Sequence, residues 1–120
     1  MRVFAVSLAL VLCLTLSAQE KEKKKGQNPF AHPKNLKVLT AEALPSAMAA
    51  YRVGLGVKCT HCHVEGDFAS DENPKKNTAR AMIRMLAEIN AKFPDGKAHV
   101  SCYTCHRGET EPKMTPPVAQ

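Results

Sequence analysis

Apolar and polar positions follow a helical period in two stretches of the chain. The first apolar stripe recurs at intervals typical of one helix face and consists of Leu44, Met48, Tyr51 and Leu55. Thr40 is a suitable N-cap before it, and Pro45 is tolerated only in a first turn, so the helix proper should begin about one turn late. Gly54 and Gly56 are expected to end this helix.

The second stretch begins at Asn73 and Pro74, which suit the N-cap and first position of a helix. It runs to about Phe93 and stops at the turn sequence Pro94-Asp95-Gly96. Its predicted inner stripe is Thr78, Met82, Met85, Leu86, Ile89 and Phe93. Most charges of the helix are expected on the other side, and they are Lys75, Lys76, Arg80, Arg84 and Glu88. No stretch has a strong strand pattern, so the predicted fold class is all-α.

Each predicted helix leads to the same five-residue pattern, C-x-x-C-H. The two copies are Cys59-Thr60-His61-Cys62-His63 and Cys102-Tyr103-Thr104-Cys105-His106. This pattern attaches a c-type haem, because the two thiols can bind one edge of the porphyrin while the following His lies under the iron. The sequence therefore predicts two covalently bound haem c groups. Cys59, Cys62, Cys102 and Cys105 would form the thioethers, and His63 and His106 would be the proximal iron ligands.

The predicted architecture is a small multihaem cytochrome c built from two helix–turn–CxxCH units with long irregular connections. Each helix is expected to fold back over the haem of its own unit. With no Trp, two Tyr and four Phe in 120 residues, the chain is poor in core material, and two haems would supply apolar bulk. Disulfides or a zinc site could also use paired cysteines, but neither explains a His directly after both second cysteines.

The N-terminal segment resembles a secretory signal peptide. Arg2 is followed by 14 apolar or small residues from Val3 to Leu16 and then by Ser17 and Ala18. A membrane-spanning helix needs roughly 20 residues, so cleavage after Ala18 is favoured over an anchor. Lipid attachment at Cys13 is disfavoured because the bulky Leu12 precedes it.

Four regions follow from this organisation. Their boundaries are a signal peptide over 1–18, a flexible basic linker over 19–34, a dihaem domain over 35–109 and a disordered tail over 110–120. The net charge of +6 lies partly in the linker run Lys21–Lys25, which is typical of a solvated segment. The expected location is the periplasm or another exported compartment, including association with the outer face of the inner membrane. The sequence has no signal for nucleic-acid binding.

A haem iron in an electron carrier commonly has a distal protein ligand as well, often Met or His. Met48 is the candidate for the first haem, because it is the only sulfur on the first stripe. Met82 and Met85 both lie within the second stripe, and periodicity does not choose between them. A Met on an inner helix face is otherwise more often a packing residue. His99 lies too close to Cys102 to reach the far face of that haem easily.

The chain resembles the cytochrome c subunit of photosynthetic reaction centres. The resemblance rests on Phe68-Ala69-Ser70-Asp71 leading into 79–90, followed by Cys102 to Gly108. It implies a two-haem, half-length member of a family whose members typically carry four haems, with Met48 and Met85 as distal ligands and Met82 as the alternative to Met85. His99 resembles a family His that ligates a haem from the missing half.

These features together predict an electron carrier, not an enzyme. Two haems would pass single electrons between redox protein partners, and the candidate partners are a membrane reaction centre and a respiratory complex. The alternative is a small dihaem redox enzyme, similar to a peroxidase, with one open haem site. No nucleic-acid or zinc partner is expected.

Overall fold

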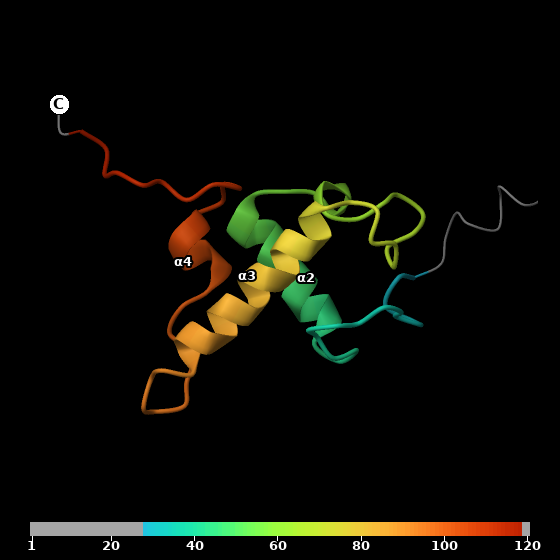
Figure 1. Ribbon diagram of the computed structural model, residues 1–120, viewed down its shortest axis with the longest axis horizontal. Helices are drawn as coiled ribbons and strands as arrows, with labels where there is room; N and C mark the ends of the chain where they lie inside the picture. The colour runs from blue at the N-terminus through green and yellow to red at the C-terminus, as the bar shows by residue number, and fades with distance from the viewer. Residues whose placement is uncertain (1–27, 119–120) are drawn as a thin grey trace, which may run out of the picture.

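The computed structural model describes residues 28–118 of the chain. The predicted signal peptide and most of the predicted linker lie outside the described residues. Within residues 28–118 the elements are α2 (Leu44–Leu55), the 3-10 turn η1 (Cys59–His61), α3 (Lys75–Asn90) and α4 (Cys102–His106). This part of the chain contains no strand, apart from one isolated bridge between Val64 and Asp67. The helical fold class is therefore confirmed for the described residues (Figure 1).

Helix α2 begins at Leu44, so Pro45 lies at its start, as predicted. Pro45 lies in the first turn, one turn after Thr40, whose Oγ1 accepts a hydrogen bond from the Ala43 N–H at 3.3 Å. The predicted stripe is the packed face, with Leu44 buried and the other members half-buried. Gly56 ends the helix in the left-handed region at φ 64°. Gly54 does not end it, since it lies inside the last turn and is buried.

Helix α3 packs on a different face from the predicted one. Met82, Met85 and Ile89 of the predicted stripe are exposed by 41%, 47% and 40%. Ile83 and Leu86 are half-buried instead, and the predicted outer residues Arg80 and Lys76 are buried and mostly buried. The packed face is thus turned by about one residue, or about 100°, around the helix axis.

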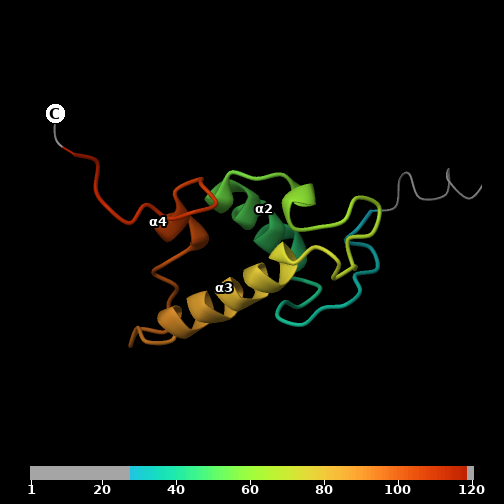
Figure 2. The ribbon, with the colours of Figure 1, turned by 45° about the horizontal axis from the view of Figure 1, so that its top comes forward.

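Helix α4 packs against the C-terminal end of α2 (Figure 2). The Gly108 N–H donates a hydrogen bond to the Gly54 carbonyl oxygen at 2.9 Å. A Cβ on Gly54 would lie 2.9 Å from the Cβ of Cys102, closer than real Cβ atoms approach. The closest packing among the described helices therefore joins α2 to the second C-x-x-C-H motif, and it requires glycine at position 54.

The described residues bury little apolar surface among themselves. Leu44, at 8% exposure, is their one buried hydrophobic side chain, and no side chain in this part of the chain is less than 2% exposed. A domain of this size normally needs a larger core, disulfides, a metal or a cofactor to be stable. The composition therefore fits a fold that is completed by a large apolar group. Residues 28–118 also contain no helix that is both long and apolar enough to cross a membrane.

We expect Gly54→Ala to destabilise the folded protein by about 1–3 kcal/mol, because the added methyl group would overpack the contact between α2 and Cys102. The measurement is the free energy of unfolding of the holoprotein in denaturant. Arg52→Ala is the matched control, since this neighbouring side chain is exposed and should change the free energy by no more than about 0.5 kcal/mol. Equal stability of Gly54→Ala and the wild type would contradict the close packing.

Candidate haem sites

The first motif is held in a tight turn. The turn η1 is closed by hydrogen bonds from the N–H groups of Cys62 and His63 to the Cys59 carbonyl oxygen, at 3.3 and 3.1 Å. In a 3-10 turn, residues three apart lie on the same side. Cys59 and Cys62 therefore lie on one side of the chain, as attachment to one edge of a planar group requires.

The second motif forms the short helix α4. Its start is fixed by a capping box in which the Ser101 N–H donates to the Thr104 Oγ1 at 2.9 Å. Cys102 and Cys105 are three residues apart on this helix, so they also share a face. Arg107 and Gly108 have φ values of 52° and 83° and turn the chain away directly after His106.

Both motif histidines are held in the same way. The Nδ1 of His63 lies 2.9 Å from the Phe68 carbonyl oxygen, and the Nδ1 of His106 lies 3.0 Å from the Glu109 carbonyl oxygen. A carbonyl oxygen can only accept a hydrogen bond, so each Nδ1 carries the proton and donates it. Each Nε2 then keeps its lone pair. This tautomer and this hydrogen bond are typical of metal-ligating His.

The four motif cysteines are free thiols of two kinds. Cys59 and Cys105 are exposed, whereas Cys62 and Cys102 are half-buried. Burial raises the pKa of both Cys62 and Cys102 above its ordinary value, and at Cys62 the nearby Lys75 partly opposes the increase in pKa. Each motif thus offers two unpaired thiols that could form thioethers.

A cavity of about 610 Å³ lies between α2, α3 and the second motif. This volume is within the range of cofactor pockets. The pKa of Tyr51 in the cavity wall is raised by burial and by the neighbouring Cys102. The lining is mostly apolar and comprises Ala49, Ala50, Tyr51, Val53, Gly54, Leu86, Asn90, Ala98, Val100, Ser101, Cys102 and Tyr103. Cys105 and His106 line a separate, smaller cavity of about 160 Å³. The donor sets and the histidine tautomers fit covalently attached haem, and the larger cavity meets the second motif at Cys102.

The predicted distal ligands occupy three different positions. Met48 is half-buried in the middle of α2, on its packed face. Met82 and Met85 are both exposed on α3, and neither lines the cavity. Met82 lies four residues before the cavity residue Leu86, so these two residues share one face of the helix. Met85 directly precedes Leu86 and is therefore rotated by about 100° around the helix axis from it. The structure therefore brings the Cys and His residues of each motif together, and the Met ligands stay predictions.

His99 has a local partner. Its Nε2 lies 2.9 and 2.8 Å from the two carboxylate oxygens of Asp95, and its ring lies 4.4 Å from the ring of Phe93. These contacts hold His99 against the turn that follows α3. The ligand role implied by the family resemblance stays a prediction.

The segment Phe68–Asp71 supports the first motif. The sequence resemblance connects this segment to the second motif, but its contacts belong mainly to the first. The Phe68 carbonyl oxygen holds His63, and the two rings lie 5.2 Å apart. Asn73, just beyond the segment, donates to the His61 carbonyl oxygen at 3.0 Å. The segment therefore contacts His63 through the carbonyl oxygen and the ring of Phe68.

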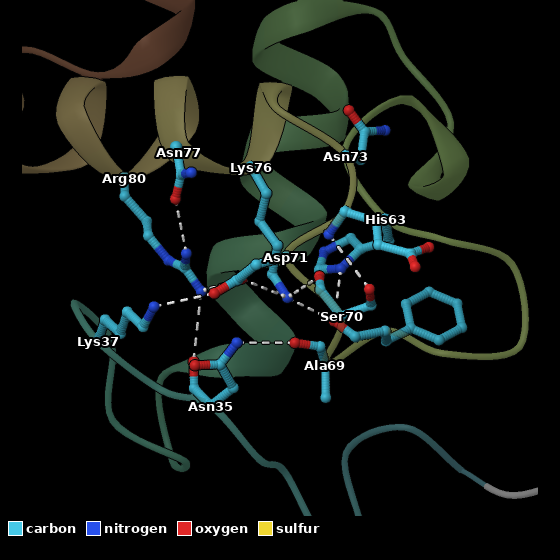
Figure 3. A network of polar contacts seen from close by, with 12 residues as sticks. Asn35, Lys37, His63, Ala69, Ser70, Asp71, Asn73, Lys76, Asn77 and Arg80 are labelled. Carbon is cyan, nitrogen blue, oxygen red and sulfur yellow. Dashed lines mark hydrogen bonds and ion pairs between the residues drawn. The ribbon is translucent and has the colours of Figure 1, made fainter.

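Asp71 is the centre of an ion cluster (Figure 3). Its carboxylate lies 2.8 Å from Lys37, 2.8 Å from Arg80 and 3.5 Å from Lys76. The pKa of Asp71 is held well below its usual range, first by the Arg80 guanidinium and then by Lys37. The cluster joins the chain before α2, the loop after the first motif and the start of α3.

Asn90 holds the segment that leads into the second motif. Its Oδ1 accepts hydrogen bonds from the N–H groups of His99 and Val100, at 2.9 and 3.0 Å. Its Nδ2 donates to the Val100 carbonyl oxygen at 2.9 Å. Three hydrogen bonds from one half-buried amide therefore fix the end of α3 to the residues directly before Cys102.

Sequence reasoning missed the roles of Asp71, Lys76, Arg80 and Asn90. The only available signal was the Phe68–Asp71 block, which the resemblance singled out without its contacts. Helical periodicity assigned Lys76 and Arg80 to the solvent side, because it cannot recognise a carboxylate that a loop brings to the helix.

Comparison with known proteins gives one family. The family model described as "Photosynthetic reaction centre cytochrome C subunit" matches residues 8–116. The chain is 33% identical over 106 residues to the photosynthetic reaction center cytochrome c subunit of Thermochromatium tepidum, covering 82% of this chain and 26% of that protein. It is 46% identical over 57 residues to cytochrome c-554 of Chloroflexus aurantiacus, covering 43% of this chain and 14% of that protein.

A third relative is the photosynthetic reaction center cytochrome c subunit of Roseobacter denitrificans. It is 43% identical over 63 residues, which cover 45% of this chain and 17% of that protein. The chain therefore spans about a quarter or less of the length of these curated relatives. No solved structure matches the chain.

We expect Asp71→Asn to lower the free energy of unfolding at pH 7 and to flatten its decrease in acid. The pKa of Asp71 is depressed in the folded state, so its contribution is present above the unfolded pKa of about 3.9 and is lost as the pH falls below that value. The measurement is the free energy of unfolding of the holoprotein between pH 7 and pH 3. Glu72→Gln, at an exposed neighbouring position, should keep the wild-type acid slope; equal slopes for Asp71→Asn and wild type would contradict the role of the cluster.

We expect Asn90→Ala to lower the free energy of unfolding by about 1–3 kcal/mol, because three backbone groups lose their partner. Asn90→Asp keeps an acceptor for the two N–H groups and should lose less. The measurement is denaturant unfolding of both holoprotein variants. If both variants lose the same amount, the two accepted hydrogen bonds do not hold this segment.

Proposed function

The chain belongs to the photosynthetic reaction centre cytochrome c subunit family, and we propose that it is a dihaem member that transfers single electrons between redox proteins. Family membership makes it an electron-transfer cytochrome c with covalently bound haem. The observation that best supports two haem sites is the matched setting of His63 and His106. Each Nδ1 is bonded to a backbone carbonyl oxygen, so each Nε2 is available to a metal.

In this proposal each motif binds one haem. Cys59 and Cys62 hold one haem c through thioethers, and Cys102 and Cys105 hold the other. His63 and His106 are the proximal ligands through Nε2. Met48 and Met85 are the proposed distal ligands, and Met82 is the alternative to Met85. Bound haem supplies the one-electron ferric/ferrous couple.

The protein's own contribution is position and environment. The carbonyl oxygens of Phe68 and Glu109 orient the proximal rings. The cavity beside Cys102 presents a mostly apolar wall to one side of the second site. In this proposal the haem of the second motif also covers the exposed apolar side chains of Met82, Met85 and Ile89 on α3, which lie outside the lining of that cavity. Low polarity and oriented ligands are the means by which a protein sets the potential of a haem.

The proposed partners are redox proteins outside the cytoplasm. The relatives in Thermochromatium and Roseobacter are named as reaction center subunits, which favours a membrane reaction centre as one partner. A respiratory complex is the other candidate, because the chain spans only part of those relatives. Export through the predicted signal peptide would place the protein in the periplasm, including the outer face of the inner membrane.

We expect the holoprotein, produced together with a haem-attachment system, to carry the mass of two covalent haems and to titrate in two one-electron steps. Both haems should be low-spin, since each iron has two protein ligands in this proposal. Mass spectrometry and a redox titration followed by absorption are the measurements. A high-spin haem that turns over peroxide would instead support the peroxidase alternative, and a colourless protein would refute both.

We expect Met48→Ala and Met85→Ala each to convert one haem to high spin, because each removes a sulfur ligand from an iron. The ferric absorption spectrum is the measurement. Met82→Ala is the matched control on the same face of α3 and should leave both haems low-spin. A high-spin haem in Met82→Ala with none in Met85→Ala would exchange the roles of these two residues.

A further inference from the structure

The carbonyl oxygens that hold His63 and His106 differ in whether a lysine also donates a hydrogen bond to them. The Phe68 carbonyl oxygen, which accepts from His63, also accepts a hydrogen bond from the Lys76 ammonium at 2.9 Å. Within residues 28–118 the Glu109 carbonyl oxygen, which accepts from His106, has no such cation. The nearby Lys113 instead pairs with the Glu109 carboxylate at 3.2 Å. The first site therefore has a cation one hydrogen bond beyond its proximal ligand, and the second does not.

Lys76 is held firmly in this position. Its side chain is only 12% exposed, and its ammonium also donates to the Ser70 carbonyl oxygen at 2.8 Å (Figure 3). Asp71 lies 3.5 Å away but is shared with Lys37 and Arg80, so one carboxylate faces three cations. The cluster keeps a surplus of positive charge. Burial reduces screening by water and salt, so this charge acts on its surroundings more strongly than an exposed lysine would.

We propose that Lys76 is a positioning residue that acts through the Phe68 carbonyl oxygen to raise the reduction potential of the haem at the first motif above that of the second. This inference rests on the proposed two-haem function. The assignment concerns the first motif alone, because only its proximal histidine shares a carbonyl with a buried cation.

Two effects of Lys76 would both raise the reduction potential of the first haem. A carbonyl oxygen that already accepts from an ammonium is a weaker acceptor for the His63 N–H, so His63 becomes a less basic ligand and stabilises the ferric state less. In addition, reduction adds one electron and lowers the charge at the iron by one, which a nearby positive charge favours. An electron shared between the two haems would therefore reside mainly on the first. The second motif would then be the site of electron entry, and the first the site of exit.

The test is Lys76→Met in the two-haem holoprotein. We expect the ferric/ferrous equilibrium of the first haem to shift about tenfold toward ferric, which lowers its potential by about 59 mV for one electron, while the second potential is unchanged. Redox titration gives the two potentials, and paramagnetic NMR of the His63 and His106 rings assigns each potential to its haem. Lys76→Arg, which keeps the cation, should restore the wild-type value.

Lys113→Met is the matched control, because Lys113 lies beside the second motif but is 74% exposed and screened. It should leave both potentials unchanged. If Lys76→Met binds only one haem, Lys76→Gln, which keeps a hydrogen-bond donor without the charge, replaces it. Unchanged potentials, or equal shifts at both haems, in whichever of these variants holds two haems would overturn the proposal.

Loss of one haem in both Lys76→Met and Lys76→Gln would also overturn the proposal, since it would make Lys76 a structural residue. Haem stoichiometry of the wild-type protein separates this inference from the one on which it rests. Fewer than two covalent haems by mass would refute the proposed function, whereas two haems with a Lys76-independent potential would refute only the role of Lys76.

Discussion

The carboxylate of Asp71 is the interaction on which the first half of the structure depends. It is the one anion among Lys37, Lys76 and Arg80, and it connects the chain before α2 to the start of α3. Without a partner, a buried cation such as Arg80 would cost several kcal/mol of desolvation. The carboxylate allows Arg80 and Lys76 to stay mostly buried, and Lys76 then reaches the carbonyl oxygen that holds His63. The geometry of the first site thus follows from a polar cluster.

The second half of the structure depends on a different constraint, which is the shortage of apolar side chains. The described residues bury a single hydrophobic side chain, while Met82, Met85 and Ile89 of α3 are exposed. In an ordinary helical domain this face would be expected to pack on another helix. Here these three side chains stay exposed and lie outside the lining of the apolar cavity between α2, α3 and the second motif. The first half therefore depends on ion pairs, whereas the apolar face of α3 is left uncovered by the described residues.

The sequence was informative wherever local chemistry decides the outcome. Neighbouring residues determine the start of α2 beside Pro45, the left-handed turn at Gly56 and the two C-x-x-C-H motifs. Helix α3 begins one residue later than predicted, because Pro74 and not Asn73 is its N-cap. The packed face of α3 did not follow, because periodicity locates an apolar stripe without saying whether protein or cofactor will cover it. The histidine partners were also out of reach. They are backbone carbonyls at Phe68 and Glu109, and any residue type supplies such an oxygen.

The contact between Gly54 and Gly108 has a consequence for how the chain folds. It joins the last turn of α2 to the second residue after the second motif, so it closes a loop that contains both motifs and all of α3. Closing so long a loop costs entropy before its contacts can compensate, which places this contact among the non-local ones that slow folding. The haem motifs, whose turns are local, can form beforehand. The closure made by the Gly54–Gly108 contact would then follow the formation of these local turns, and it fixes the second motif against α2.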